Sequence, residues 1–131
     1  MNTSIVVLIV DDEEAIRLVL EEVLTEGGYA VRFASNAEEA MSLLDDAEAC
    51  IRALITDVNL SPGKQTGWDV ARHAREVTDN LPVVYITGAS AHEWSVYGVP
   101  KSVLLSKPFA PAQIVTAVSH LLNSRLASAA D

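Results

Sequence analysis

Five side chains that can do chemistry follow short apolar runs of the sequence. They are two adjacent carboxylates, a third carboxylate, a hydroxyl and an amine: Asp11, Asp12, Asp57, Thr87 and Lys107. An ionised acid at the end of a buried run is costly unless a neighbouring group neutralises or uses it. Asp57, which ends the central run Ile51 to Thr56, therefore marks a candidate site.

Gathered at one place, these groups would suit magnesium-assisted phosphoryl transfer. Three carboxylates close together repel one another, and a hard divalent cation such as Mg²⁺, which prefers oxygen ligands, relieves that repulsion. Asp57 beside such an ion is a potential nucleophile toward a phosphoryl group. The ion and Lys107 would stabilise the negative charge of the transferred group, and Thr87 can hydrogen-bond one of its oxygens. The residues alone indicate phosphoryl transfer onto Asp57.

The elements that must position these groups form an alternating pattern. Apolar, β-branched runs predict strands over residues 4–10, 29–34, 51–56, 82–87 and 102–106. Apolar residues at three- and four-residue spacing predict a helix after each strand, and Asn36 is the expected cap of the second helix. This order predicts an α/β fold with a five-stranded parallel sheet and helices on both faces, whose ligands bind at the carboxyl ends of the strands.

Composition limits the remaining possibilities. The chain of 131 residues suits one domain, which we place at residues 1–123, followed by a flexible C-terminal tail at 124–131. A net charge of -9 argues against nucleic acid as a partner. The single cysteine excludes an internal disulfide and a cysteine-based zinc cage. No apolar run is long enough to span a membrane, and the first run is predicted to be a strand instead of a signal peptide, so the expected compartment is the cytoplasm.

Four short motifs occur in order, each after its own predicted strand. They are Val10-Asp11-Asp12, Thr56-Asp57-Val58, Ile86-Thr87-Gly88 and Ser106-Lys107-Pro108-Phe109. Each is weak alone, but together they resemble the receiver domain of a two-component response regulator over about residues 4 to 123. The variant resembles chemotaxis-regulator-like receivers, which are found alone or fused to hybrid kinases, and we expect the stand-alone, single-domain type. The resemblance implies a flavodoxin-like fold with strand order 2-1-3-4-5.

The resemblance also implies roles for the acids. Asp57 would accept a phosphoryl group from a sensor histidine kinase or a histidine phosphotransfer protein. Asp12, Asp57 and the backbone carbonyl of Asn59 would bind Mg²⁺, and Asp11 would act mainly through metal-bound water. The protein would assist its own phosphorylation and dephosphorylation without being a multiple-turnover enzyme.

The remaining motif residues would respond to the phosphoryl group. Lys107 would pair with it, and Thr87 would swing toward it. The Lys107–Pro108 peptide bond would be cis, which only a bond before proline allows cheaply.

The resemblance implies protein partners as well. The kinase would dock near the first helix and the fifth loop, at Ala15, Ile16, Val19, Pro108 and Phe109. Output would be contact with a downstream protein through the face made by the fourth helix, fifth strand and fifth helix, or phosphoryl transfer as a shuttle or sink. The expected state is a monomer or weak dimer.

Two features depart from the common pattern. Leu104 occupies the switch position three residues before Lys107, where many receivers have an aromatic residue. Tyr85, Trp94 or Tyr97 are the alternatives for that role. The loop after Asp57 is also longer than usual, since it includes the segment 62–67 between Leu60 and Trp68.

Other functions fit parts of the pattern. A phosphatase with an aspartyl-phosphate intermediate would use Asp57, but a second acid is expected where Asn59 stands. A flavin-binding module is disfavoured because the acids 11–14 would repel a phosphate. A receiver-like binding module without phosphorylation is a third alternative. Taken alone, Asp11 and Asp12 fit a cap for the following helix equally well, but the presence of Asp57 and Lys107 disfavours that explanation.

Overall fold

The computed structural model describes residues 4–60 and 65–130, and residues 125–130 by their backbone alone. The elements in chain order are β1 Val6–Val10, α1 Glu14–Glu26, β2 Ala30–Ala34, α2 Ala37–Asp45, η1 Ala47–Ala49, β3 Ile51–Asp57, α3 Gly67–Val77, β4 Val83–Thr87, η2 Ala91–Glu93, α4 Trp94–Tyr97, β5 Val103–Ser106 and α5 Pro111–Ala130. The labels η1 and η2 denote 3₁₀ helices.

The five strands form one parallel sheet in the order β2-β1-β3-β4-β5. The predicted fold class and strand order are therefore confirmed. The register pairs Val10 with Thr56 and Thr87 with Ser106. Because the strands are parallel and end at matching positions, the residues that follow them meet at one edge of the sheet.

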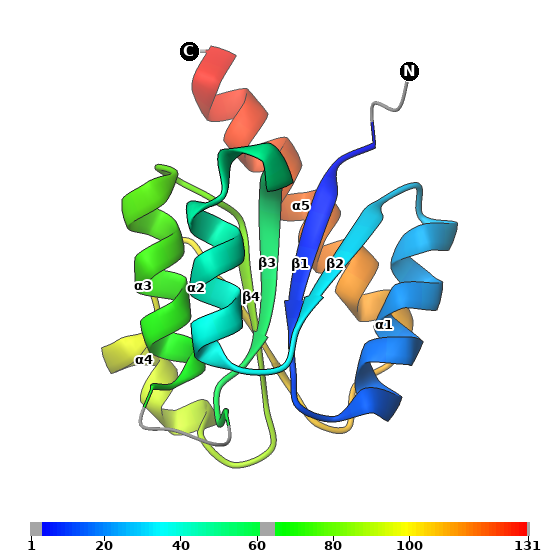
Figure 1. Cartoon of the computed structure of the whole chain (residues 1–131), viewed down its shortest axis with the longest axis vertical. Helices are drawn as coiled ribbons and strands as arrows, with labels where there is room; N and C mark the ends of the chain where they lie inside the picture. Colours follow the sequence, from blue (N-terminus) through cyan, green and yellow to red (C-terminus); the bar gives the residue numbers. More distant parts are fainter. Residues whose placement is uncertain (1–3, 61–64, 131) are drawn as a thin grey trace.

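Helices cover both faces of the sheet, as Figure 1 shows: α2 and α3 lie side by side on one face, and α5 crosses behind the strands. Alternate residues of β1 feed two separate cores. Leu8 and Val10 pack toward α2 and α3, whereas Val7 and Ile9 pack toward α1 and α5. A strand buried on both faces explains why the sequence shows continuous apolar runs without alternation.

Local capping sets where the helices begin. The Asn36 side chain accepts a hydrogen bond from the Glu39 N–H at 2.8 Å, as predicted. Thr66 and Asp69 form a reciprocal capping box at the start of α3, in which the Thr66 N–H donates to Asp69 Oδ2 at 2.9 Å.

Gly67 joins α3 to the end of β3. Its N–H donates to the Val58 carbonyl at 2.8 Å, and a Cβ at this position would lie 2.1 Å from the Asp57 carbonyl oxygen. Only a residue without a side chain fits so close to the strand that carries Asp57.

Some elements differ from the sequence prediction. The helix expected over 91–97 has those bounds and ends before Gly98, but its first turn is the 3₁₀ helix η2 and only α4 is α-helical. The strand β4 begins at Val83, one residue after Pro82, which has no N–H to donate.

The last helix is longer than predicted. The backbone of α5 continues to Ala130, into the segment 124–131 that we expected to be a tail, because no glycine or proline there stops the helix. The flexibility of that segment stays a prediction. The predicted long loop lies partly at residues 61–64, outside the described residues. Among the helices of the described ranges, none combines the length and the apolar character needed to cross a membrane.

Candidate functional site

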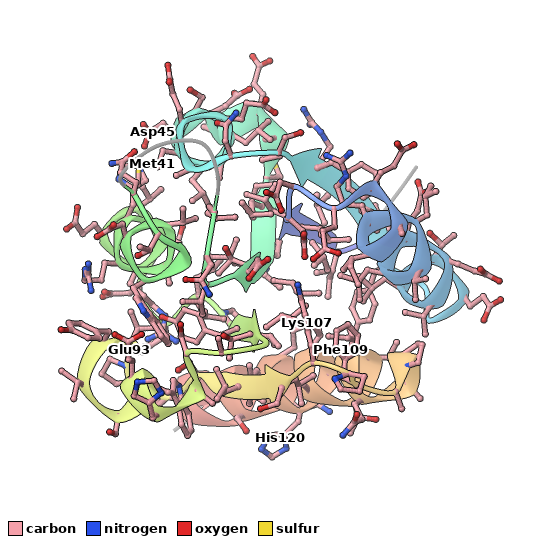
Figure 2. The ribbon with its side chains drawn as sticks, turned by 90° about the horizontal axis from the view of Figure 1, so that it is seen from below. Met41, Asp45, Glu93, Lys107, Phe109 and His120 are labelled. Atoms are coloured by element: carbon pink, nitrogen blue, oxygen red, sulfur yellow. The ribbon has the colours of Figure 1, made fainter. Side chains whose placement is uncertain are left out.

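The five predicted chemical residues lie at the carboxyl edge of the sheet. Figure 2 looks onto this end of the molecule and shows Lys107 projecting from the segment after β5 toward the ends of the other strands. Asp57 and Thr87 are the last residues of β3 and β4, and the segments after β1 and β5 supply Asp11, Asp12 and Lys107.

The three carboxylates form a tight cluster. Asp11, Asp12 and Asp57 each offer an oxygen, and these oxygens lie within 4.8 Å of one another. Asp11 and Asp57 are buried, whereas Asp12 is exposed. Such a cluster of hard oxygen donors suits a divalent cation.

One carboxylate oxygen of Asp11 is buried without a hydrogen bond to any described residue. Within the described residues, Asp11 Oδ2 is the one buried side-chain oxygen or nitrogen without a hydrogen-bond partner. Burial raises the pKa of Asp11 to about 6; the Glu13 N–H, which donates to Oδ1 at 2.8 Å, opposes the rise, and the charge of Asp57 adds to it. A buried oxygen that lacks a hydrogen bond and lies beside two further carboxylates suits a ligand of a cation, either directly or through water bound to the cation.

Asp57 is held by a loop amide and by Lys107. The Asn59 N–H donates to Asp57 Oδ1 at 3.2 Å, and Lys107 Nζ lies 3.3 Å from Asp57 Oδ2. Burial raises the pKa of Asp57, while the charge of Lys107 and the Asn59 hydrogen bond oppose that rise. The roles of the Asn59 carbonyl as a metal ligand and of Asp11 through water stay predictions.

Lys107 lies among three carboxylates. Besides Asp57, its amine lies 2.9 Å from Glu13 Oε1 and 3.9 Å from Asp11 Oδ2. Burial alone would lower the pKa of Lys107, but the Glu13 hydrogen bond and the charges of Asp57 and Asp11 together raise it. Lys107 is therefore a permanent cation at the site.

The Thr87 hydroxyl faces the loop that follows β4. Its oxygen accepts hydrogen bonds from the N–H groups of Ala89 at 3.2 Å and Ser90 at 2.8 Å. The Ser90 hydroxyl in turn lies 3.3 Å from the Asn59 side-chain nitrogen, which donates to it. These hydrogen bonds connect Thr87 through Ser90 to Asn59, in the loop after Asp57.

Sequence reasoning missed two residues of the site. Ser90 links Thr87 to Asn59, and a serine three residues after a threonine is a signal for a local turn that could have found it. Glu13 contacts Lys107, and it belongs to the same acidic run as Asp11 and Asp12. The sequence shows that this run is acidic, but it does not show which way each side chain points.

The Leu104 position differs from an aromatic switch. Leu104 is partly buried and pairs with Tyr85 on the neighbouring strand. Tyr85 is fully buried, its hydroxyl accepts a hydrogen bond from the Val99 N–H at 3.1 Å, and its ring lies 4.6 Å from that of Trp68. An aromatic ring is thus present on the same face of the sheet, one strand away. Its role in switching stays a prediction.

The predicted docking residues lie partly on the surface. Ala15, Val19 and Pro108 are exposed, whereas Ile16 and Phe109 pack against the core on the α1 and α5 face. The Lys107–Pro108 peptide bond is cis, as predicted. Docking of a kinase at these residues stays a prediction.

A cavity of about 670 Å³ lies away from the acids. Its lining comes from the end of α3, the start of β4, the segment before β5 and α5, and includes Arg75, Lys101 and His120. None of the five predicted residues lines it, so the cavity is separate from the site at the carboxyl edge.

Comparison with known proteins agrees with this geometry. A family model described as response regulator receiver domain matches residues 7–119. The response regulator MprA of Mycobacterium bovis (strain BCG / Pasteur 1173P2) is 31% identical over 122 residues, which are 92% of this chain and 51% of the relative. The chain spans about half the length of the curated relatives it matches.

Solved structures show the same likeness. A response regulator receiver protein from Sinorhizobium medicae WSM419 is 42% identical with a TM-score of 0.89, covering 94% of this chain and 98% of that chain. A CheY-like receiver domain protein from Methanospirillum hungatei JF-1 has a TM-score of 0.84 at 22% identity, covering 96% and 99%, and supports the fold alone. The chain therefore belongs to the response regulator receiver domain family of two-component signalling.

Proposed function

We propose that Asp57 accepts a phosphoryl group from a phosphohistidine of a sensor kinase or a phosphotransfer protein. The observation that supports this most directly is the contact of Lys107 with Asp57, 3.3 Å apart, within a cluster of three carboxylates. One oxygen of the buried Asp57 carboxylate contacts the Lys107 cation, and the three carboxylates together carry more negative charge than Lys107 neutralises. This arrangement suits the binding of a metal ion and the arrival of a phosphoryl group.

The transfer needs no proton from this chain. The phosphorus–nitrogen bond of the donor breaks, its electron pair stays on the imidazole, and an ionised oxygen of Asp57 bonds to phosphorus. Lys107 neutralises charge on the phosphoryl oxygens. The Thr87 oxygen already accepts two backbone N–H groups, so its hydroxyl proton is available to a phosphoryl oxygen.

The acids of the cluster have a second task. Asp12, Asp57 and the Asn59 carbonyl would hold Mg²⁺, with Asp11 acting through water, and the bound ion would neutralise charge on the transferring oxygens. The buried Oδ2 of Asp11, which has no hydrogen-bond partner among the described residues, supports this assignment.

Signalling would follow through protein contact. We expect a cytoplasmic, monomeric or weakly dimeric receiver that contacts a downstream protein, or passes the phosphoryl group on as a shuttle or sink, without nucleic acid or membrane. The net charge of -9 supports a protein partner over a nucleic acid.

The test is intact-mass measurement after incubation with acetyl phosphate. We expect one phosphoryl adduct that requires both Mg²⁺ and Asp57, so Asp57→Asn abolishes it. Asp79→Asn, an exposed acid outside the cluster, is the matched control and should keep it. A folded wild-type protein that gains no adduct, and is inert toward kinases too, would favour a binding module. Repeated turnover on small phosphate esters would favour a phosphatase.

A further inference from the structure

The carboxylate nearest to Lys107 is not the proposed phosphoacceptor. The Lys107 amine lies 2.9 Å from Glu13 Oε1, 3.3 Å from Asp57 Oδ2 and 3.9 Å from Asp11 Oδ2. The cation is thus shared, and its shortest contact is with a residue that sequence motifs do not assign to the site.

Glu13 and Asp57 differ in their freedom to move. The Glu13 side chain is 58% exposed, whereas that of Asp57 is 8% exposed. The Glu13 backbone is nevertheless fixed, since its N–H donates to Asp11 Oδ1 at 2.8 Å and its carbonyl accepts the Arg17 N–H at 3.2 Å. Glu13 can therefore release Lys107 by a side-chain rotation that leaves the core unchanged.

The charges decide when such a release would occur. Phosphorylation replaces the single negative charge of the Asp57 carboxylate with nearly two on the phosphoryl oxygens, a net gain of about one negative charge beside Lys107. The exposed contact with Glu13 biases an equilibrium by only about two- to fivefold, as exposed ion pairs do. The phosphoryl oxygens are therefore the stronger partner, and Lys107 would leave Glu13 for them.

We propose that Glu13 is a positioning residue that holds Lys107 in the unphosphorylated protein and gives it up when Asp57 is phosphorylated. The inference rests on the proposed function of Asp57. With acetyl phosphate, the bond from phosphorus to the acetate oxygen breaks, acetate leaves with the electron pair, and an Asp57 oxygen bonds to phosphorus. No proton is transferred; a Lys107 N–H exchanges Glu13 Oε1 for a phosphoryl oxygen.

Glu13 also slows the reaction in this scheme. It holds Lys107 away from the incoming group and places a negative charge at the mouth of the site, where the donor is an anion. Glu13→Gln should therefore speed phosphorylation of Asp57.

The kinetic test compares neighbouring glutamates. Glu14→Gln is the matched control, because Glu14 is exposed, lies one residue away, and loses the same charge. We expect phosphorylation by acetyl phosphate at saturating Mg²⁺ to be about two- to fivefold faster in Glu13→Gln than in Glu14→Gln. Glu13→Asp keeps the charge on a shorter side chain and should fall between wild type and Glu13→Gln.

A second readout needs no phosphorylation. The nitrogen resonance of the Lys107 amine, assigned with Lys107→Arg, should shift in unphosphorylated Glu13→Gln and stay in place in Glu14→Gln. The amide spectrum of each variant shows whether that variant is folded, so unfolding is distinguished from loss of the Glu13–Lys107 contact.

The outcomes distinguish the two proposals. An adduct on wild type with equal rates in the two glutamine variants, or a Lys107 resonance that Glu13→Gln does not move, overturns the role of Glu13 and leaves the role of Asp57 intact. Failure of wild type to form an adduct overturns both.

Discussion

At the scale of single residues, the strongest signal is the buried Oδ2 of Asp11, which has no hydrogen-bond partner among the described residues. Because burial raises the pKa of Asp11 to about 6, the folded protein without metal disfavours the ionised form. Ionised Asp11 therefore destabilises the metal-free fold at neutral pH. We interpret this as stability given up for a site that carries charge.

The first prediction concerns that carboxylate. Asp11→Asn should raise the free energy of unfolding of the metal-free protein by about 1–3 kcal/mol at pH 7. This gain in stability should be complete above about pH 6, the folded pKa of Asp11. It should vanish as the pH falls toward the unfolded pKa of 3.8, because Asp11 is then protonated in both the folded and the unfolded protein. Urea denaturation at pH 7 and pH 4 in EDTA measures the difference.

Asp12→Asn is the control for Asp11→Asn, because Asp12 is the exposed acid of the same pair. It should change stability less. An equal gain in the two variants, or a gain at Asp11 that does not depend on pH, would contradict this explanation.

The second prediction concerns the cation. Mg²⁺ at about 100 times its dissociation constant should stabilise the wild-type fold by about 2.7 kcal/mol. Removing the ion with EDTA should reverse the gain, which denaturation curves at a series of Mg²⁺ concentrations would show. The gain should shrink in Asp57→Asn, which lacks one of the three carboxylates. Unchanged stabilisation in that variant would place the ion elsewhere.

At the scale of elements, the start of α3 determines how the loop after Asp57 returns to the core. The Thr66 N–H donates to Asp69 Oδ2, and this hydrogen bond is the main cause of the lowered pKa of Asp69. Asp69 also pairs with Arg72. The capping box thus gives a long loop a fixed end point.

The third prediction is that Asp69→Ala destabilises the fold by about 0.5–2 kcal/mol at pH 7. A lowered folded pKa means that the contribution of Asp69 is present above the unfolded value of 3.8 and is lost as pH falls through the folded value. Denaturation curves of both proteins should therefore converge at acid pH. Asp79→Ala, an exposed acid beyond the end of α3, should show no comparable loss.

At the scale of the whole molecule, the sheet and the site have different degrees of predictability. The parallel sheet and the edge where Asp57 and Lys107 meet follow from apolar runs and from the geometry of parallel sheets, whereas the strand order is implied by the resemblance to receiver domains. The contact of Glu13 with Lys107 and the link through Ser90 depend on side-chain directions in loops, which have no period that a sequence could reveal.

Two helices differ from their predictions. The helix predicted over 91–97 keeps those bounds, but only Trp94–Tyr97 is α-helical, and apolar residues such as Val96 remain exposed there. The last helix continues past residue 123 because small residues tolerate a helix even without a core to cover.

The fourth prediction tests how the layers meet. Gly67→Ala should destabilise the protein by about 3 kcal/mol, since its Cβ would lie 2.1 Å from the Asp57 carbonyl oxygen and force α3 away from β3. Gly28→Ala is the control: its site is open and only its positive φ of 93° opposes a side chain, so about 1 kcal/mol is expected. Thermal unfolding of both variants measures the two losses of stability. Similar losses would contradict the close approach of α3 to β3 at Gly67.

The hydrogen bond from Gly67 to Val58 has a further consequence for how such a chain can change over generations. It ties together the two ends of the segment between them, so the position of Asp57 is set at the base of that segment and not by its length. Doubling the length of a connecting segment costs only about 0.6 kcal/mol of closure entropy. We therefore expect changes in the length of this segment to leave the acceptor chemistry intact, so that related receivers can differ here in the partners they meet.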